Sequence, residues 1–137
     1  MAAPPDDPSI TDETKVLRRV VPGRYSRTSG IPEEGTFRKD GDGTGTSVTL
    51  WLSDEDLNIT RAPHPDFGVV SLYVSEFRKL GLSIAYVDEP GNPNHCEVFG
   101  DRTKGNRVQL AKAARWVAYP IGYPEELKKQ LWTRDDP

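Results

Sequence analysis

Residues 46–52 read TSVTLWL, and this stretch decides the fold class of the chain. Apolar side chains occupy positions 48, 50 and 52, whereas Ser, Thr and Trp occupy positions 47, 49 and 51. A period of two is typical of a β-strand with one buried face. The Gly-rich stretch 40–45 precedes the strand as a turn. Ser53 and Asp56 follow it with the Ser-x-x-acid pattern that opens a helix.

Other short elements extend outward from this strand. The sequence predicts strands over 16–21, 69–74, 82–88 and 95–99, and helices over 75–80, 106–117 and 124–132. Twelve prolines and twelve glycines in 137 residues supply the turns between them. The pattern indicates a small single α+β domain with four to five short, mostly antiparallel strands and one or two packing helices.

The ends of the chain differ from this pattern. Residues 1–14 are rich in Pro and Asp and offer little to bury, so we expect a disordered N-terminal tail there. Residues 15–133 then form the domain, and residues 134–137 fray. The first residues have no basic region followed by an apolar one, and no apolar run approaches the roughly 18–20 residues of a membrane span. We therefore expect a cytoplasmic protein with no membrane partner.

The net charge of −3 conceals an alternation along the chain. Residues 15–39 carry seven bases against two acids, and residues 40–58 carry five acids and no base. Residues 102–115 carry only bases. Such blocks either form two poles or neutralise one another in the fold.

The second basic block is the firmest candidate for a binding site. It lies in a turn and along the helix predicted over 106–117, and a helix N-terminus with nearby cations is a natural site for anions. Trp116, or alternatively Trp51, would add an apolar anchor, because Trp and Arg dominate binding hot spots. The predicted binding residues are Arg102, Lys104, Arg107, Lys112, Arg115 and Trp116.

A second candidate lies in residues 89–100, EPGNPNHCEVFG, where His95 stands beside Cys96, the only cysteine. Adjacent residues of a strand point to opposite faces, so the two side chains cannot form a catalytic pair. We expect Cys96 to be buried as a small apolar filler. His95 either anchors the loop or acts as a general base with Glu97, which shares its strand face.

Metal sites find little support in the sequence. Asp40 to Gly45 resembles the first half of a calcium loop, but the position of the bidentate Glu is held by Trp51. Two histidines and one cysteine lack the spacing of a zinc site, and His64 lies in a Pro-flanked loop. We expect no metal and no cofactor.

Three segments carry a resemblance to known proteins: FGVVSL (67–72), NPNHCEVFG (92–100) and LAKAARWV (110–117). Across residues 35–117 the chain resembles small bacterial proteins of uncharacterised function. The resemblance implies that His95, the turn 101–105 and the LAKAARWV helix form one shared feature. It brings no catalytic residues with it.

These observations favour a small, cytoplasmic, non-enzymatic accessory or regulatory protein. Its basic helix edge would meet a protein partner with an acidic surface, in a bacterial multi-protein system such as a defence or conflict module. Nucleic-acid phosphate is a weaker alternative, because the isoelectric point is about 5.4. The alternative function is a small nucleotide- or RNA-processing enzyme that uses His95 as base and Arg102, Lys104 or Arg107 as phosphate clamp.

Overall fold

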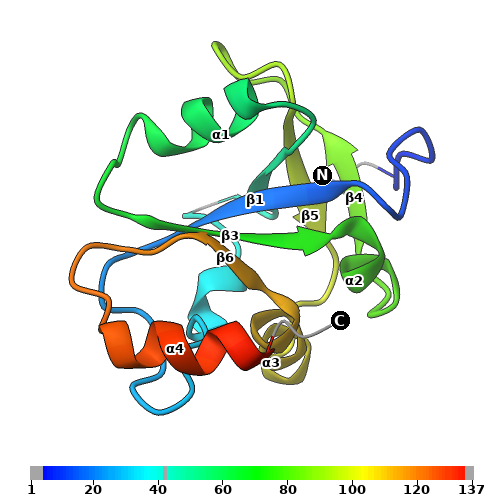
Figure 1. The fold of residues 1–137 in the computed structure, drawn as a ribbon. Coiled ribbons are helices and arrows are strands. Elements are labelled where there is room, and N and C mark those ends of the chain that lie inside the picture. Colours follow the sequence, from blue (N-terminus) through cyan, green and yellow to red (C-terminus); the bar gives the residue numbers. More distant parts are fainter. Residues whose placement is uncertain (1–4, 42, 135–137) are drawn as a thin grey trace.

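The computed structural model describes residues 5–41 and 43–134. Over these residues the chain forms one sheet of six antiparallel strands in the order β4-β5-β2-β1-β3-β6 (Figure 1). The strands are β1 (Lys15–Val20), β2 (Thr46–Leu50), β3 (Gly68–Tyr73), β4 (Ser83–Tyr86), β5 (His95–Phe99) and β6 (Arg115–Ala118). The α+β class is confirmed, with more strands than the four to five predicted.

Four α-helices accompany the sheet in the described residues, whereas the sequence predicts one or two packing helices. They are α1 (Asp54–Arg61), α2 (Val74–Arg78), α3 (Lys104–Ala113) and α4 (Glu125–Arg134), with a short 3-10 helix, η1 (Glu34–Phe37). Figure 1 shows α1 on one side of the sheet and α3 and α4 on the other. None of the described helices is long and apolar enough to cross a membrane.

The face of the sheet toward α2 and α3 carries the main apolar core. The strand alternation places Val16, Val48 and Cys96 on this face, and each is at most 2 % exposed. Phe77 from α2 and Leu110 from α3 complete the cluster. Burial of these aliphatic and aromatic side chains is the main force that holds the helices to the sheet.

The opposite face of the sheet is polar although it is buried. The register aligns Ser71, Leu17, Thr49 and His95 across four neighbouring strands, and all four are at most 6 % exposed. Helix α1 packs on β1 and β2, and the loop 87–94 contacts Thr49 through Asn92 and His95 through Val87. Asp56 joins this helix to the loop, because its Oδ1 accepts a hydrogen bond from Asn94 Nδ2 at 2.7 Å.

Asp56 also supports the start of α1, as the sequence pattern predicts. Its Oδ2 accepts hydrogen bonds from the backbone N–H groups of Leu52 at 2.9 Å and Ser53 at 3.0 Å. A carboxylate at this position satisfies donors that a helix leaves without internal partners. The same side chain therefore fixes both the helix and the loop.

The prediction of a helix over 106–117 is wrong for its last four residues, 114–117. Helix α3 begins after Thr103, whose Oγ1 accepts from the Asn106 N–H at 3.1 Å, and it ends at Ala113. Ala114 is extended, with ψ of 145°, and Trp116 then pairs with Val70 of β3. Aromatic and β-branched residues favour strands, and strand pairing here overrides the helical spacing of LAKAARWV.

The disordered tail predicted over 1–14 needs correction for residues 5–14. Ile10 is 2 % exposed within the main core, and the Asp7 N–H donates to the Ile84 carbonyl at 2.8 Å. Arg78 binds the segment through Asp12, at 2.7 Å, and through Asp6. Two of the four acids that suggested disorder, Asp6 and Asp12, are thus paired with a cation. Residues 1–4 and 135–137, parts of the predicted tail and frayed end, lie outside the described residues.

Candidate functional site

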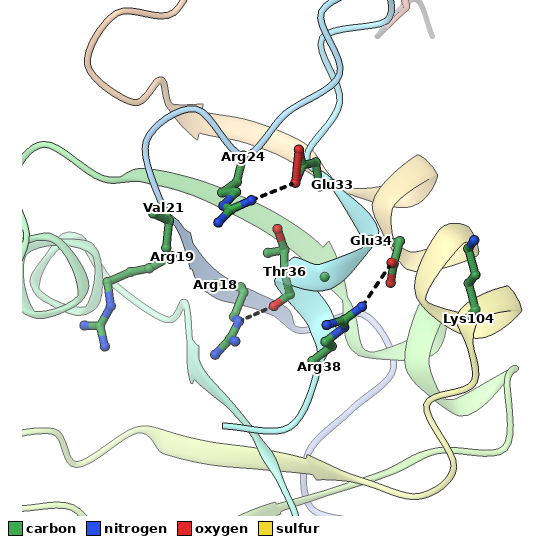
Figure 2. Close-up of a pocket in the computed structure, with 10 residues that line it drawn as sticks. Arg18, Arg19, Val21, Arg24, Glu33, Glu34, Thr36, Arg38 and Lys104 are labelled. Atoms are coloured by element: carbon green, nitrogen blue, oxygen red, sulfur yellow. Dashed lines mark hydrogen bonds and ion pairs between the residues drawn. The ribbon is translucent and has the colours of Figure 1, made fainter. Parts of the chain in front are cut away.

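A pocket of about 630 Å³ lies where β1, the segment after it, η1 and the start of α3 meet (Figure 2). Five basic and two acidic side chains line it, although the whole chain is acidic. We call it the basic pocket, and its lining is Arg18, Arg19, Val21, Arg24, Glu33, Glu34, Gly35, Thr36, Arg38 and Lys104.

Arg18 lines the basic pocket with a guanidinium that four hydrogen bonds hold in place. Its guanidinium donates to both carboxylate oxygens of Asp40, at 2.9 and 3.0 Å, and to the carbonyls of Thr36 and Ser47, both at 2.9 Å. Burial alone would raise the pKa of Asp40, but the hydrogen bonds and charge of Arg18 bring that pKa below its usual value. The Arg18 side chain therefore links β1 to η1, to the turn before β2 and to β2 itself.

The acids of the pocket are already partnered. Glu34 accepts a hydrogen bond from Arg107, which is the main cause of its lowered pKa, and lies 3.6 Å from Arg38. Glu33 and Arg24 approach to 3.9 Å on the exposed rim. Arg19 and Lys104 have no carboxylate within 4 Å among the described residues. The pocket thus keeps a positive surplus that can attract an anion.

The structure brings Lys104 alone, of the predicted binding residues, into the lining of the basic pocket. Arg107 stands behind the lining and holds Glu34. Arg102 ties the end of β5 to the turn before β2, since it donates to the carbonyls of Val98 and Thr44. Burial lowers the pKa of Arg102.

The other predicted binding residues lie around the end of α3. Arg115 is on β6, not on a helix, and its Nη1 donates to the carbonyls of residues 112, 113 and 114. Lys112 is exposed on α3. Trp116 is half-buried, and its indole N–H donates to the Gly30 carbonyl at 2.9 Å. Its ring contacts Tyr119 and Tyr123, so it packs in an aromatic cluster.

Sequence reasoning missed four arginines of the basic pocket: Arg18, Arg19, Arg24 and Arg38. All four belong to the basic block 15–39, whose excess of charge is visible in the sequence. The block does not reveal which of its members share a surface. That depends on η1, which lies beside β1 so that Thr36 accepts a hydrogen bond from Arg18, while Arg38 faces Glu34 and Arg24 faces Glu33 (Figure 2).

His95 and Cys96 point to opposite faces of the sheet, as the alternation predicts. Cys96 is 0 % exposed in the apolar core, and burial raises the pKa of its thiol to about 12. His95 lies on the polar face, where its Nδ1 is 2.7 Å from the Val87 carbonyl oxygen. The carboxylate nearest its Nε2 is that of Glu89, at 3.9 Å, and not that of Glu97.

The described residues hold no group of three or more His, Cys, Asp or Glu side chains placed to bind a metal. His64 stacks on Phe67 at the surface, with ring centroids 4.4 Å apart. A scan against protein-family models finds no match, and comparisons with curated proteins and with solved structures find none either.

Proposed function

We propose that the protein is a small, non-enzymatic accessory or regulatory protein that captures an acidic segment of a partner protein in the basic pocket. The observation that supports this most directly is the surplus of cations in a pocket of about 630 Å³ on an acidic chain. Lys104 supplies a cation with no carboxylate within 4 Å among the described residues, while Arg18 is held in place by Asp40. Preorganised cations bind anions with little ordering cost.

The lining favours a peptide over a nucleic acid. Its described residues include no aromatic ring on which a base could stack. Val21 adds an apolar side chain to the lining, and this residue is 50 % exposed. Glu33 and Glu34 add negative charge that would oppose a continuous phosphate backbone. A segment that combines carboxylates with an aliphatic side chain matches this mixture best.

The setting that we propose is a bacterial multi-protein system such as a defence or conflict module, inside the cytoplasm. It rests on the resemblance of residues 35–117 to small bacterial proteins. A small protein with one charged pocket suits an adaptor role, because electrostatic complementarity gives specificity and fast association.

A charge-matched pair of variants tests the pocket. Arg24→Glu, Arg38→Glu and Lys104→Glu together reverse three exposed cations of the lining. Arg61→Glu, Lys79→Glu and Lys129→Glu produce the same net charge on exposed sites outside the pocket. Fluorescence anisotropy with a labelled glutamate-rich peptide should show that the first triple variant loses binding and the second retains most of it. Equal loss in both would mean that only net charge matters.

A pull-down from bacterial lysate, with and without nuclease, then identifies the class of partner. A stoichiometric protein that survives nuclease and is lost with the first triple variant supports the proposal. Recovery of RNA or DNA alone would replace it with nucleic-acid binding. Catalytic turnover that His95→Ala abolishes without unfolding the protein would favour the enzyme alternative instead.

A further inference from the structure

A second, smaller cavity lies on the polar face of the sheet, away from the apolar core. It has a volume of about 60 Å³ and is lined by residues of β1, β2, β5, α1 and the loop before β5, among them Thr49, Thr60 and His95. Arg19, Glu89 and Asn92 line both this cavity and an open cleft of about 480 Å³. The cavity is therefore the inner end of a cleft that a small molecule can enter.

His95 presents an unused acceptor to this cavity. Its Nδ1 is 2.7 Å from the Val87 carbonyl oxygen, which can only accept, so Nδ1 carries the hydrogen. In the neutral ring Nε2 then holds a lone pair. The side chain is 7 % exposed, and Nε2 is buried with no hydrogen-bond partner among the described residues.

Asn92 presents a second unused acceptor. Its Nδ2 lies 3.0 Å from Thr49 Oγ1 and 3.4 Å from Glu89 Oε2. Because a carboxylate oxygen only accepts, this contact identifies the amide nitrogen and leaves Oδ1 as the free acceptor. Oδ1 is buried and has no partner in the described part of the chain. Buried acceptors rarely go unpaired, and two in the wall of one cavity indicate that a donor is missing.

The charges at the mouth of the cavity indicate the nature of that donor. Glu89 is half-exposed, and its Oε1 lies 3.9 Å from His95 Nε2, so a carboxylate joins the two neutral acceptors. An ammonium group offers three donors and a positive charge to this set. Arg19 lies at the same mouth, and its Nη1 donates to the Thr60 carbonyl at 3.2 Å, which holds the guanidinium there.

We propose that this cavity and its cleft bind a small zwitterion of the α-amino acid type. The ammonium group enters the cavity and donates to His95 Nε2, Asn92 Oδ1 and Glu89, while the carboxylate faces Arg19 in the cleft. The inference stands apart from the proposed function, because His95, Asn92 and Glu89 do not line the basic pocket. Arg19 lines both sites, and its hydrogen bond to the Thr60 carbonyl holds the guanidinium at the cleft. A water molecule that donates to the two buried acceptors is the competing occupant.

Nitrogen-15 NMR of the full chain separates these occupants. The imidazole signals of His95 and the side-chain NH₂ signals of Asn92 are followed during titration with glycine, methylammonium, tetramethylammonium and acetate. Saturable shifts with glycine, and weaker ones with methylammonium, support the proposal, while the exposed His64 ring stays unchanged. Tetramethylammonium carries the charge without an N–H donor, and acetate carries only the carboxylate, so neither should produce a saturable shift.

Two variants assign the two ends of the ligand. Glu89→Gln should weaken both glycine and methylammonium by about tenfold, the effect of losing one charge-assisted hydrogen bond. Arg19→Gln should weaken glycine by a similar factor and leave methylammonium unchanged. No saturable shift with glycine or methylammonium would overturn the proposal in favour of water. An equal shift with tetramethylammonium would overturn it in favour of a site that attracts any cation. The triple reversal in the basic pocket retains glycine binding, so the two proposals fail separately.

Discussion

Cys96 shows how burial, helped by the nearby charge of Asp7, removes the reactivity of a thiol. It is 0 % exposed, and burial raises its pKa to about 12, so almost no thiolate exists at neutral pH. We expect no reaction between the native protein and a disulfide reagent such as dithionitrobenzoate at pH 8, and complete reaction in denaturant. The absorbance of the released thiolate measures both rates. Rapid stoichiometric labelling of the native protein would contradict the burial of Cys96.

Asp40 supplies a pH-dependent contribution to stability. Its folded pKa lies below the ordinary value of 3.8, so the contribution is fully present above that value and is lost as the pH falls through the folded pKa. Since its side chain is 44 % exposed, we expect Asp40→Asn to lower the free energy of unfolding by only about 1–2 kcal/mol at pH 7. Denaturant titrations at several pH values should show this difference shrink toward acid pH.

Glu33 is the matched control for Asp40. It faces Arg24 at 3.9 Å, and both side chains are about half-exposed or more. Exposed pairs of this kind contribute roughly 0–1 kcal/mol. Glu33→Gln should therefore leave the free energy of unfolding nearly unchanged at every pH. A loss equal to that of Asp40→Asn would show that Asp40 has no special role.

At the scale of elements, β6 depends on a glycine opposite it. A Cβ added to Gly68 of β3 would lie 2.6 Å from Trp116 Cζ3 and 2.8 Å from Pro120 Cδ. We expect Gly68→Ala to displace β6 and to lower the free energy of unfolding by about 1–3 kcal/mol, a typical cost of overpacking. Thermal unfolding followed by tryptophan fluorescence measures the effect.

Gly105 of α3 provides the opposite case. The nearest atom to an added Cβ is Thr103 Oγ1 at 3.8 Å, so the position has room. Alanine is more favourable than glycine in a helix by up to about 1 kcal/mol. We therefore expect Gly105→Ala to raise the free energy of unfolding by about 0.3–1 kcal/mol. A loss of stability there would mean that the N-terminal turn of α3 is packed more tightly than the structure shows.

The elements that the sequence predicts well are those whose pattern is local. TSVTL forms β2 as its alternation predicts, although both faces of the strand are covered and Leu52, beyond its end, is 60 % exposed. The Ser53–Asp56 pattern starts α1. The prediction of one helix through LAKAARWV is wrong because only its first half is helical. Its second half leads into β6, which pairs with β3. That pairing depends on a strand more than forty residues away along the chain, which no local window contains.

At the scale of the whole molecule, the parts of each site that follow from a local pattern are predictable, and the parts that depend on distant contacts are not. His95 stands out in the sequence, but its partners Val87 and Glu89 are fixed by the path of the loop. The basic pocket joins β1 to Lys104, which lies over eighty residues away along the chain. Charge blocks are visible in a sequence, whereas their meeting in one pocket depends on how η1 and the start of α3 pack beside β1.

A ligand in the basic pocket should stabilise the entire domain, because a ligand that binds only the folded state adds to its free energy of unfolding. At about one hundred times its dissociation constant, an acidic peptide adds about 2.7 kcal/mol. For a chain of this size that raises the melting temperature by roughly 8 °C. Differential scanning calorimetry at low salt measures the rise.

Salt and charge reversal decide whether that rise comes from the basic pocket. At about 1 M salt the screening length falls to about 3 Å, and the rise should disappear if exposed cations such as Lys104 produce it. It should also be absent from the variant that reverses Arg24, Arg38 and Lys104, and present in the charge-matched variant at Arg61, Lys79 and Lys129. A rise that persists in the pocket variant would place the acidic ligand on another surface, since the two variants carry the same net charge and differ only in where it lies.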